Sequence, residues 1–185
     1  MVTNDVIRIT DEIRSNLGNI FKSQYNEIEN ITSEFLTYKD TVYSGSFDYH
    51  NYYKEGHNNI VRAVDNKPMM SVFNFNIKNT VKIFRLLQLE KFKPQLSGIR
   101  VYANTNLPMH LDLNRGEVGR DHPIYSIMLT GKGSMVFFSN KSDGSRLVAV
   151  PAFSEFIMYP THMQHGALTY EEDMDVLQIQ LGDMY

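Results

Sequence analysis

The second half of the chain is divided into short β-type runs by closely spaced turn residues, and this pattern constrains the fold most. From Ser97 onward, Val, Ile, Tyr and Phe are frequent, and turn-rich segments such as Gly131-Lys132-Gly133 and Asn140–Gly144 interrupt them. The expected strands cover residues 98–104, 110–113, 124–130, 134–139, 146–150, 155–159, 163–169 and 174–181. This succession of short strands predicts a sandwich or jelly roll with a mainly β core.

In the first part of the chain, the spacing of the apolar residues is instead that of a helix. Apolar residues between Val6 and Phe35 recur mostly three and four positions apart, which is typical of a helix packed on a core. Thr10 can cap the start of this helix, and the two acids that follow suit its dipole. Gly18 is the point at which the region would divide into two helices.

A second helix is expected over residues 76–92, ended by Pro94. Its expected buried face carries Ile77, Val81, Phe84 and Leu87. The length predicts a single domain over residues 1–185. In this domain, residues 1–96 form a supporting layer of helices and loops, and residues 97–185 form the β core.

Composition excludes several functional classes. The chain has 42% hydrophobic and 21% charged residues, as globular proteins do, and its net charge of −3 predicts no strong nucleic-acid binding. It has no apolar run near the about 20 residues that a membrane span needs, and no signal peptide, so we expect a cytoplasmic protein. With no cysteine, any metal must be held by histidine and carboxylate.

The candidate metal ligands are His110, Asp112 and His165. Residues i and i+2 of a strand point to one face, so His110 and Asp112 can reach the same point. His165 opens the seventh expected strand, which neighbours the second in a jelly roll. Two imidazoles and one carboxylate form the facial triad of non-haem Fe(II) oxygenases. His50, His57 and His122 lie in polar, turn-like segments and are expected to be surface residues.

Two segments resemble 2-oxoglutarate-dependent Fe(II) oxygenases. Residues 100–112 are similar to the family's Tyr-bearing strand and His-Xaa-Asp motif, and residues 151–166 to its hydrophobic strand, proline and distal histidine. The resemblance covers roughly residues 98–181. It implies a double-stranded β-helix of the cupin type, Fe(II), and 2-oxoglutarate as the cosubstrate of a dioxygenase that hydroxylates an unactivated C–H bond. It makes His110, Asp112 and His165 the catalytic metal triad and Tyr102 a contact to the cosubstrate.

The sequence departs from this family at one position. Family members usually have an Arg or Lys about ten residues after the distal histidine, which binds the far carboxylate of 2-oxoglutarate. The last expected strand, Met174–Leu181, contains no cation. Arg100 is the first candidate to replace it, because alternation puts it on the same face as Tyr102. Lys132 and Arg146 are the other candidates.

Two alternatives stay open. Pro160–His165 also resembles the second cupin motif, with His162 in a glycine position and Glu117 near the usual carboxylate ligand, so a cupin-type metal-dependent enzyme without 2-oxoglutarate is one of them. The other is a non-catalytic jelly-roll binding module that uses the aromatic segment Tyr43–Tyr53 as its contact surface. The substrate, a small molecule or a peptide, is not identified by the sequence.

Overall fold

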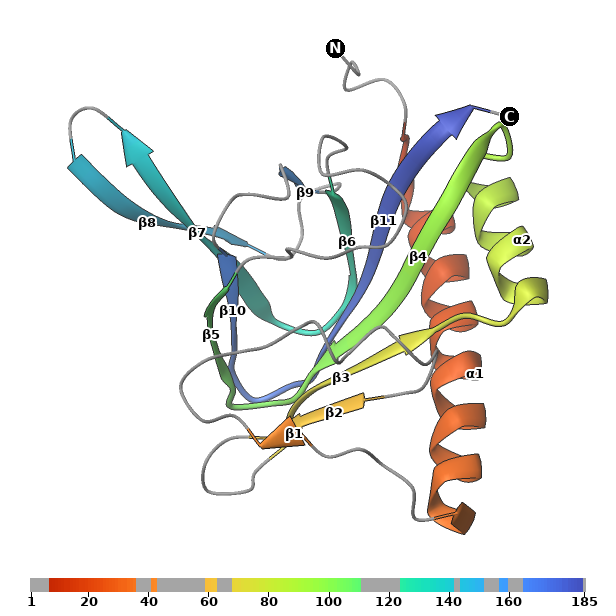
Figure 1. The fold of residues 1–185 in the computed structure, drawn as a ribbon, viewed down its shortest axis with the longest axis horizontal. Helices are drawn as coiled ribbons and strands as arrows, with labels where there is room; N and C mark the ends of the chain where they lie inside the picture. Colours follow the sequence, from red (N-terminus) through yellow and green to blue (C-terminus); the bar gives the residue numbers. More distant parts are fainter. Residues whose placement is uncertain are drawn as a thin grey trace.

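In the computed structural model, two β-sheets face each other and two helices cover the outer face of the larger sheet (Figure 1). The structure describes residues 7–35, 41–42, 59–62, 68–110, 124–141, 144–151, 157–159 and 165–184. The elements are α1 (Asp11–Phe35), β1 (Thr41–Val42), β2 (Asn59–Arg62), β3 (Pro68–Asn74), α2 (Ile77–Leu86), β4 (Phe92–Val101), β5 (Asn106–His110), β6 (Ile124–Thr130), β7 (Gly133–Lys141), β8 (Gly144–Pro151), β9 (Ile157–Tyr159), β10 (His165–Thr169) and β11 (Met174–Met184).

The strand order is that of a jelly roll. The larger sheet has the order β1-β2-β3-β4-β11-β6-β9, and the smaller sheet has the order β5-β10-β7-β8. If β4 to β11 are counted as strands 1 to 8, the part of the larger sheet from β4 to β9 has the order 1-8-3-6. The smaller sheet has the order 2-7-4-5. This arrangement confirms the predicted fold class, a mainly β double-stranded β-helix with N-terminal helices.

The strand positions agree closely with the sequence pattern. Strand β6 has the predicted bounds, and each other predicted run overlaps one strand from β4 to β11. The run predicted over residues 110–113 overlaps β5 only at His110, and its other residues lie outside the described part of the chain. Strand β4 begins at Phe92, so the expected border between residues 96 and 97 falls inside a strand. Pro94 lies in β4, opposite Leu181, and does not end a helix. Strands β1 to β3 continue the larger sheet beyond β4, because β3 pairs with β4 along its length.

Helix α1 is one continuous helix. The backbone N–H of Ile13 donates to Thr10 Oγ1 at 3.2 Å, which confirms the predicted N-terminal cap. Gly18 lies within α1, so the expectation of two helices was wrong. A glycine inside a helix costs only about 1 kcal/mol. The buried side chains of Leu17 and Phe21 on either side of Gly18 stabilise the helix against the sheet.

Helix α2 buries only part of the face that was expected, namely Phe84 and the adjoining Leu87. It is capped by Asn76, whose Oδ1 accepts from Asn79 N–H at 2.8 Å. Ile83 and Phe84 are buried, whereas Ile77 is 79% and Val81 is 41% exposed. Several sets of residues on a short helix satisfy the helical period, and the contact with α1 and the sheet selects among them. Neither helix is long and apolar enough, within its described residues, to cross a membrane.

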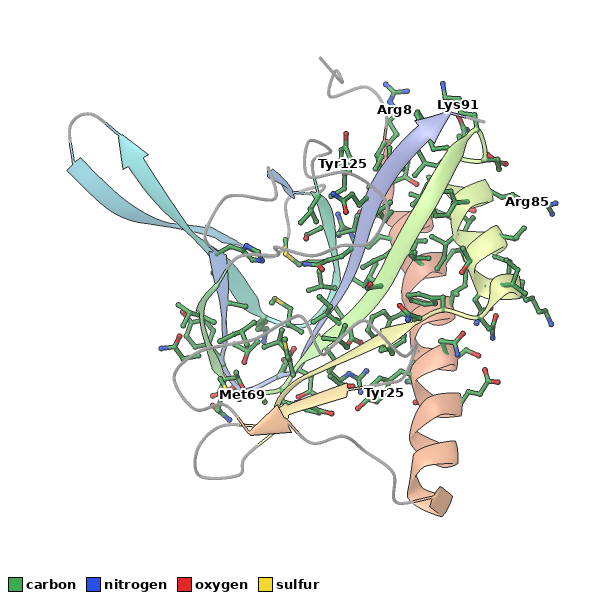
Figure 2. All side chains as sticks on the ribbon, in the orientation of Figure 1. Arg8, Tyr25, Met69, Arg85, Lys91 and Tyr125 are labelled. Atoms are coloured by element: carbon green, nitrogen blue, oxygen red, sulfur yellow. The ribbon has the colours of Figure 1, made fainter. Side chains whose placement is uncertain are left out.

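An aromatic layer joins α1 to the larger sheet. Phe21 of α1 contacts Phe73 of β3 edge-to-face, with ring centroids 5.0 Å apart, and the rings of Tyr25 and Phe75 surround the same side chain. Figure 2 shows Tyr25 between the helix and the sheet. The large side chains on this face of the sheet therefore belong to the interface with the helices, and the opposite face borders the interior of the jelly roll.

Candidate functional site

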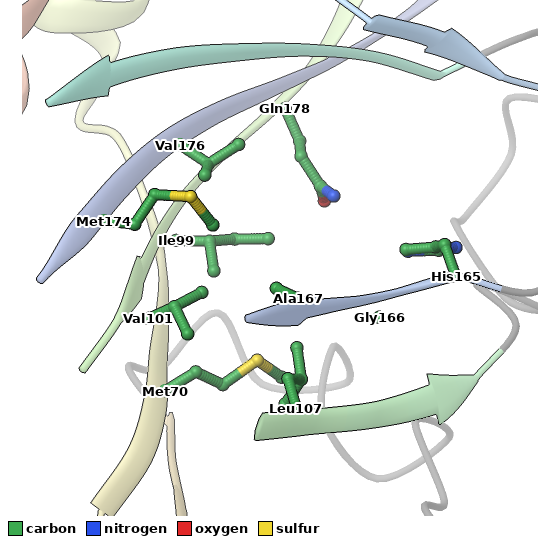
Figure 3. Close-up of a pocket in the computed structure, with 10 residues that line it drawn as sticks. All are labelled: Met70, Ile99, Val101, Leu107, His165, Gly166, Ala167, Met174, Val176 and Gln178. Atoms are coloured by element: carbon green, nitrogen blue, oxygen red, sulfur yellow. The ribbon is translucent and has the colours of Figure 1, made fainter. Parts of the chain in front are cut away.

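The interior of the jelly roll contains a small cavity of about 30 Å³ (Figure 3). Its walls come from both sheets. Among the described residues, the polar side chains that line it are His165 of β10 and Gln178 of β11. The larger apolar side chains in its lining are Met70, Ile99, Val101, Leu107, Met174 and Val176.

His165 lies at the start of β10 and is 3% exposed. In the register of the smaller sheet, its Cα is paired with that of Phe137 on β7 and that of His110 on β5. Strands β5 and β10 are the second and seventh strands of the jelly roll, so they are neighbours as predicted. The register shifts between His165 and Ala167, and irregularities of this kind often re-aim side chains near functional sites.

The pairing of His110 with His165 brings two of the three expected metal ligands together. Residues directly opposite on antiparallel strands have Cβ atoms about 4.5–5.5 Å apart on one face. Asp112 lies outside the described residues, as do Glu117, His122, His162, His50, His57 and Tyr43–Tyr53. Within the part of the chain that is described, no three His, Asp or Glu side chains are grouped as a metal site. The imidazole and carboxylate donors of the expected triad are those that suit Fe(II).

Arg100 lies on the other face of the larger sheet. Its Nε and Nη2 donate to the two carboxylate oxygens of Asp175 at 2.7 and 3.0 Å, and its guanidinium carbon is 3.9 Å from the centre of the Tyr25 ring. Burial alone would lower the pKa of Arg100, but the hydrogen bonds and charge of Asp175 raise this pKa overall above its ordinary value. This cation is thus held in the interface with α1.

Tyr102, two residues after Arg100, faces the same side of the sheet. Its hydroxyl is 3.0 Å from the hydroxyl of Tyr25 on α1, within hydrogen-bond distance. Arg100 and Tyr102 share a face as predicted, but it is the face toward the helices, whereas Ile99 and Val101 line the cavity. The expected contacts of these two residues with 2-oxoglutarate are therefore not supported by their positions.

Of the two other candidate cations, Lys132 lies on the surface and not at the expected anchor position. Lys132 Nζ is 3.2 Å from Glu172 Oε1, and both side chains are more than half exposed, so this is a surface pair. Arg146 lies in β8, opposite Ser139, and only its backbone is described.

Gln178 was not among the predicted site residues. It is 4% exposed and its side chain points into the cavity (Figure 3). The signal in the sequence was present: Met174, Val176 and Gln178 lie on one strand face, and a glutamine that follows two apolar residues on an interior face needs a polar neighbour.

Comparisons with known proteins give only distant likenesses. No family model matches the chain, and no curated protein does. A 2OG-Fe(II) oxygenase family protein from Burkholderia pseudomallei is 14% identical, with a TM-score of 0.46, over 62% of this chain and 68% of that chain. A variant of oxalate decarboxylase from B. subtilis is 12% identical, with a TM-score of 0.42, over 72% of this chain.

An oxalate oxidase in complex with the substrate analogue glycolate is 9% identical, with a TM-score of 0.39, over 48% of this chain. This chain spans 29% of the oxalate decarboxylase and 42% of the oxalate oxidase. At these identities and TM-scores, the likenesses establish neither a family nor an activity for the chain, and the jelly-roll assignment depends on its own strand order.

Proposed function

We propose that this chain is a metal-dependent enzyme that binds Fe(II) through His110, Asp112 and His165. The observation that carries the proposal is the register pairing of His110 with His165, since His165 lines the interior cavity. Asp112 follows His110 by two residues, the spacing that gives a strand two ligands on one face. Bound iron would supply the activation of oxygen, because a three-residue facial triad leaves positions open for other ligands.

The protein surroundings suit an organic substrate with an apolar part. His165 is almost fully buried, and the cavity beside it is lined mainly by Met, Ile, Val and Leu side chains. These side chains would exclude water and bind the apolar part of the substrate by burying its surface. Gln178 would supply a hydrogen-bonding group within the same cavity.

The more specific form of the proposal is a 2-oxoglutarate-dependent dioxygenase that hydroxylates its substrate. The similarity of residues 100–112 and 151–166 to that family supports this form. In its reaction, 2-oxoglutarate loses CO₂ and becomes succinate, one oxygen atom of O₂ enters succinate and the other enters the hydroxylated product. The proposed substrate is a small molecule or a peptide.

One observation favours the second form, a cupin-type metal-dependent enzyme that does not use 2-oxoglutarate. Arg100 already has a carboxylate partner on the far face of the sheet, and Lys132 is on the surface. Among the described residues, none of those that line the cavity is a Lys or Arg. A carboxylate buried there without a cation would cost several kcal/mol.

Two titrations test the proposal. The purified metal-free protein is titrated with Fe(II) under anaerobic conditions, and we expect one tight site per chain. Addition of 2-oxoglutarate to the iron-loaded protein should then produce a weak visible charge-transfer band, and succinate release should follow exposure to oxygen. Tight Fe(II) binding without an effect of 2-oxoglutarate supports the cupin-type form. Failure to bind Fe(II) would contradict the proposal and support the non-catalytic binding module.

A further inference from the structure

Three buried polar side chains form a row across the interior face of the larger sheet. Gln178 of β11 is directly paired with Ser97 of β4 on one side and with Ser126 of β6 on the other. Their exposed fractions are 4%, 2% and 0%. Paired residues on adjacent antiparallel strands share a face, so the two serines lie beside Gln178 on the side of the cavity.

The central residue of the row, Gln178, lies across the cavity from His165 (Figure 3). Figure 3 shows the Gln178 side chain directed from β11 into the space that His165 borders from β10. The other described residues that line the cavity are apolar or contribute backbone, as at Gly166. The flanking residues Ser97 and Ser126 have short side chains that end in a hydroxyl group, and of the three residues in the row it is Gln178 that lines the cavity. Gln178 therefore offers a confined hydrogen-bonding group in a cavity whose described lining is mainly apolar.

The chemistry of the row favours an uncharged partner. A glutamine amide has two N–H donors and an oxygen with two lone pairs, and a serine hydroxyl can donate and accept, so these groups can hold a ligand besides their contacts within the fold. All three are neutral. A carboxylate that enters loses its hydration and meets no positive charge in the row, whereas an amide loses far less and finds matching donors and acceptors.

We infer that Gln178, flanked by Ser97 and Ser126, contacts the substrate and selects an uncharged amide group over a carboxylate. This inference depends on the proposed function, because it names the substrate chemistry of that site. The volume of about 30 Å³ admits only a small terminal group. The substrate thus inserts a short amide-bearing end into the cavity, and the rest of it extends toward the metal ligands.

Acetamide and acetate test this selectivity, because they have nearly the same shape and differ in charge. Both are titrated into the full-length, metal-free protein in mildly alkaline buffer, and binding is followed by the NMR shifts of the Ile99 and Val101 methyl groups. We expect acetamide to bind at least roughly tenfold more tightly than acetate, equivalent to about 1.4 kcal/mol. Equal affinities, or no shift of these methyl groups by acetamide, would overturn the inference.

Two variants test whether Gln178 makes the contact with acetamide. Gln178→Met keeps the length of the side chain and removes its hydrogen bonds, so acetamide binding should weaken roughly tenfold. Gln180→Met is the matched control, since Gln180 is buried on the same face of the same strand but does not line the cavity. Its acetamide affinity should equal that of the parent protein, and an equal loss in both variants would overturn the role of Gln178.

A separate Fe(II) titration distinguishes the two proposals. Gln178→Met should retain the parent's Fe(II) affinity, because Gln178 is a substrate contact and not a metal ligand. If the parent binds no Fe(II), the proposed function fails, whereas the preference for acetamide is measured without metal and is decided by its own result. If Gln178→Met does not fold, the comparison of acetamide with acetate in the parent protein still decides the selectivity.

Discussion

His110 and His165 are register partners on the neighbouring antiparallel strands β5 and β10, although most of the β core separates them in the sequence. Their proximity follows from backbone pairing within a sheet. A substitution of either histidine should therefore alter the candidate metal site without disrupting the pairing of β5 with β10.

The first prediction concerns the metal ligands. His110→Ala, Asp112→Ala and His165→Ala should each weaken Fe(II) binding by at least about a hundredfold, because the loss of one of three protein ligands affects the metal more than the loss of an outer contact. Anaerobic titration of each variant measures this. His50→Ala and His122→Ala serve as controls and should bind like the parent. Parent-like binding by His165→Ala would refute the triad, and loss of binding in His162→Ala would identify that neighbour as the ligand.

The second prediction concerns the ion pair between Arg100 and Asp175. Asp175→Ala leaves a largely buried guanidinium without its carboxylate, so the free energy of unfolding should fall by about 2–4 kcal/mol. Urea unfolding measures this loss, and Fe(II) binding should be retained because the pair lies on the helix side of the sheet. Glu172→Ala is the control: it breaks the exposed pair with Lys132 and should cost less than about 1 kcal/mol. A similar loss in both variants would contradict the structural role of Arg100.

The third prediction concerns the close approach of Gly98 to Phe73. A Cβ atom at residue 98 would lie 2.2 Å from the Phe73 ring, which is itself held by other aromatic rings. Gly98→Ala should therefore destabilise the protein by roughly 1–3 kcal/mol in urea unfolding. Phe73→Leu in the same chain should recover part of this loss, so the two effects should not add.

Gly18→Ala is the matched control for Gly98→Ala. A Cβ atom at residue 18 of helix α1 would meet nothing within 4 Å. Alanine is the better helix former, so this variant should gain about 0.5–1 kcal/mol of stability. A loss of stability in Gly18→Ala, or none in Gly98→Ala, would show that the packing around these glycines differs from the structure.

The fourth prediction concerns alkaline pH. Tyr125 is 2% exposed, and burial raises the pKa of its hydroxyl above the ordinary value of 10.0 (Figure 2). Above pH 10.0 the unfolded chain loses this proton before the folded chain does, so unfolding becomes more favourable as the pH rises. This one group contributes a slope of up to about 1.4 kcal/mol per pH unit.

Tyr125→Phe isolates the contribution of this hydroxyl. Urea unfolding at neutral pH and above pH 10.0 should show a smaller alkaline loss of stability in the variant than in the parent. Identical alkaline slopes would mean that the Tyr125 proton is not held by burial.

The local sequence pattern was sufficient to predict much of the fold. Strand β6 has its predicted bounds, and Thr10 caps α1 as expected, because turn residues and capping hydroxyls act over a few neighbouring positions. The same information predicted only part of the buried face of α2, because Phe84 is buried as expected whereas Ile77 is exposed. Ile77 and Phe84 both fit a helical stripe, and only the position of α1 and the sheet decides between them.

For the candidate site, the sequence by itself determined which residues share a face. The two-residue period of a strand places Arg100 with Tyr102, and Ile99 with Val101, in any fold that keeps the strand. Only the tertiary structure decided which pair faces the cavity. Alternation is symmetric between the two faces of a sheet, and the packing of α1 with its aromatic side chains makes one face a helix interface and the other the interior.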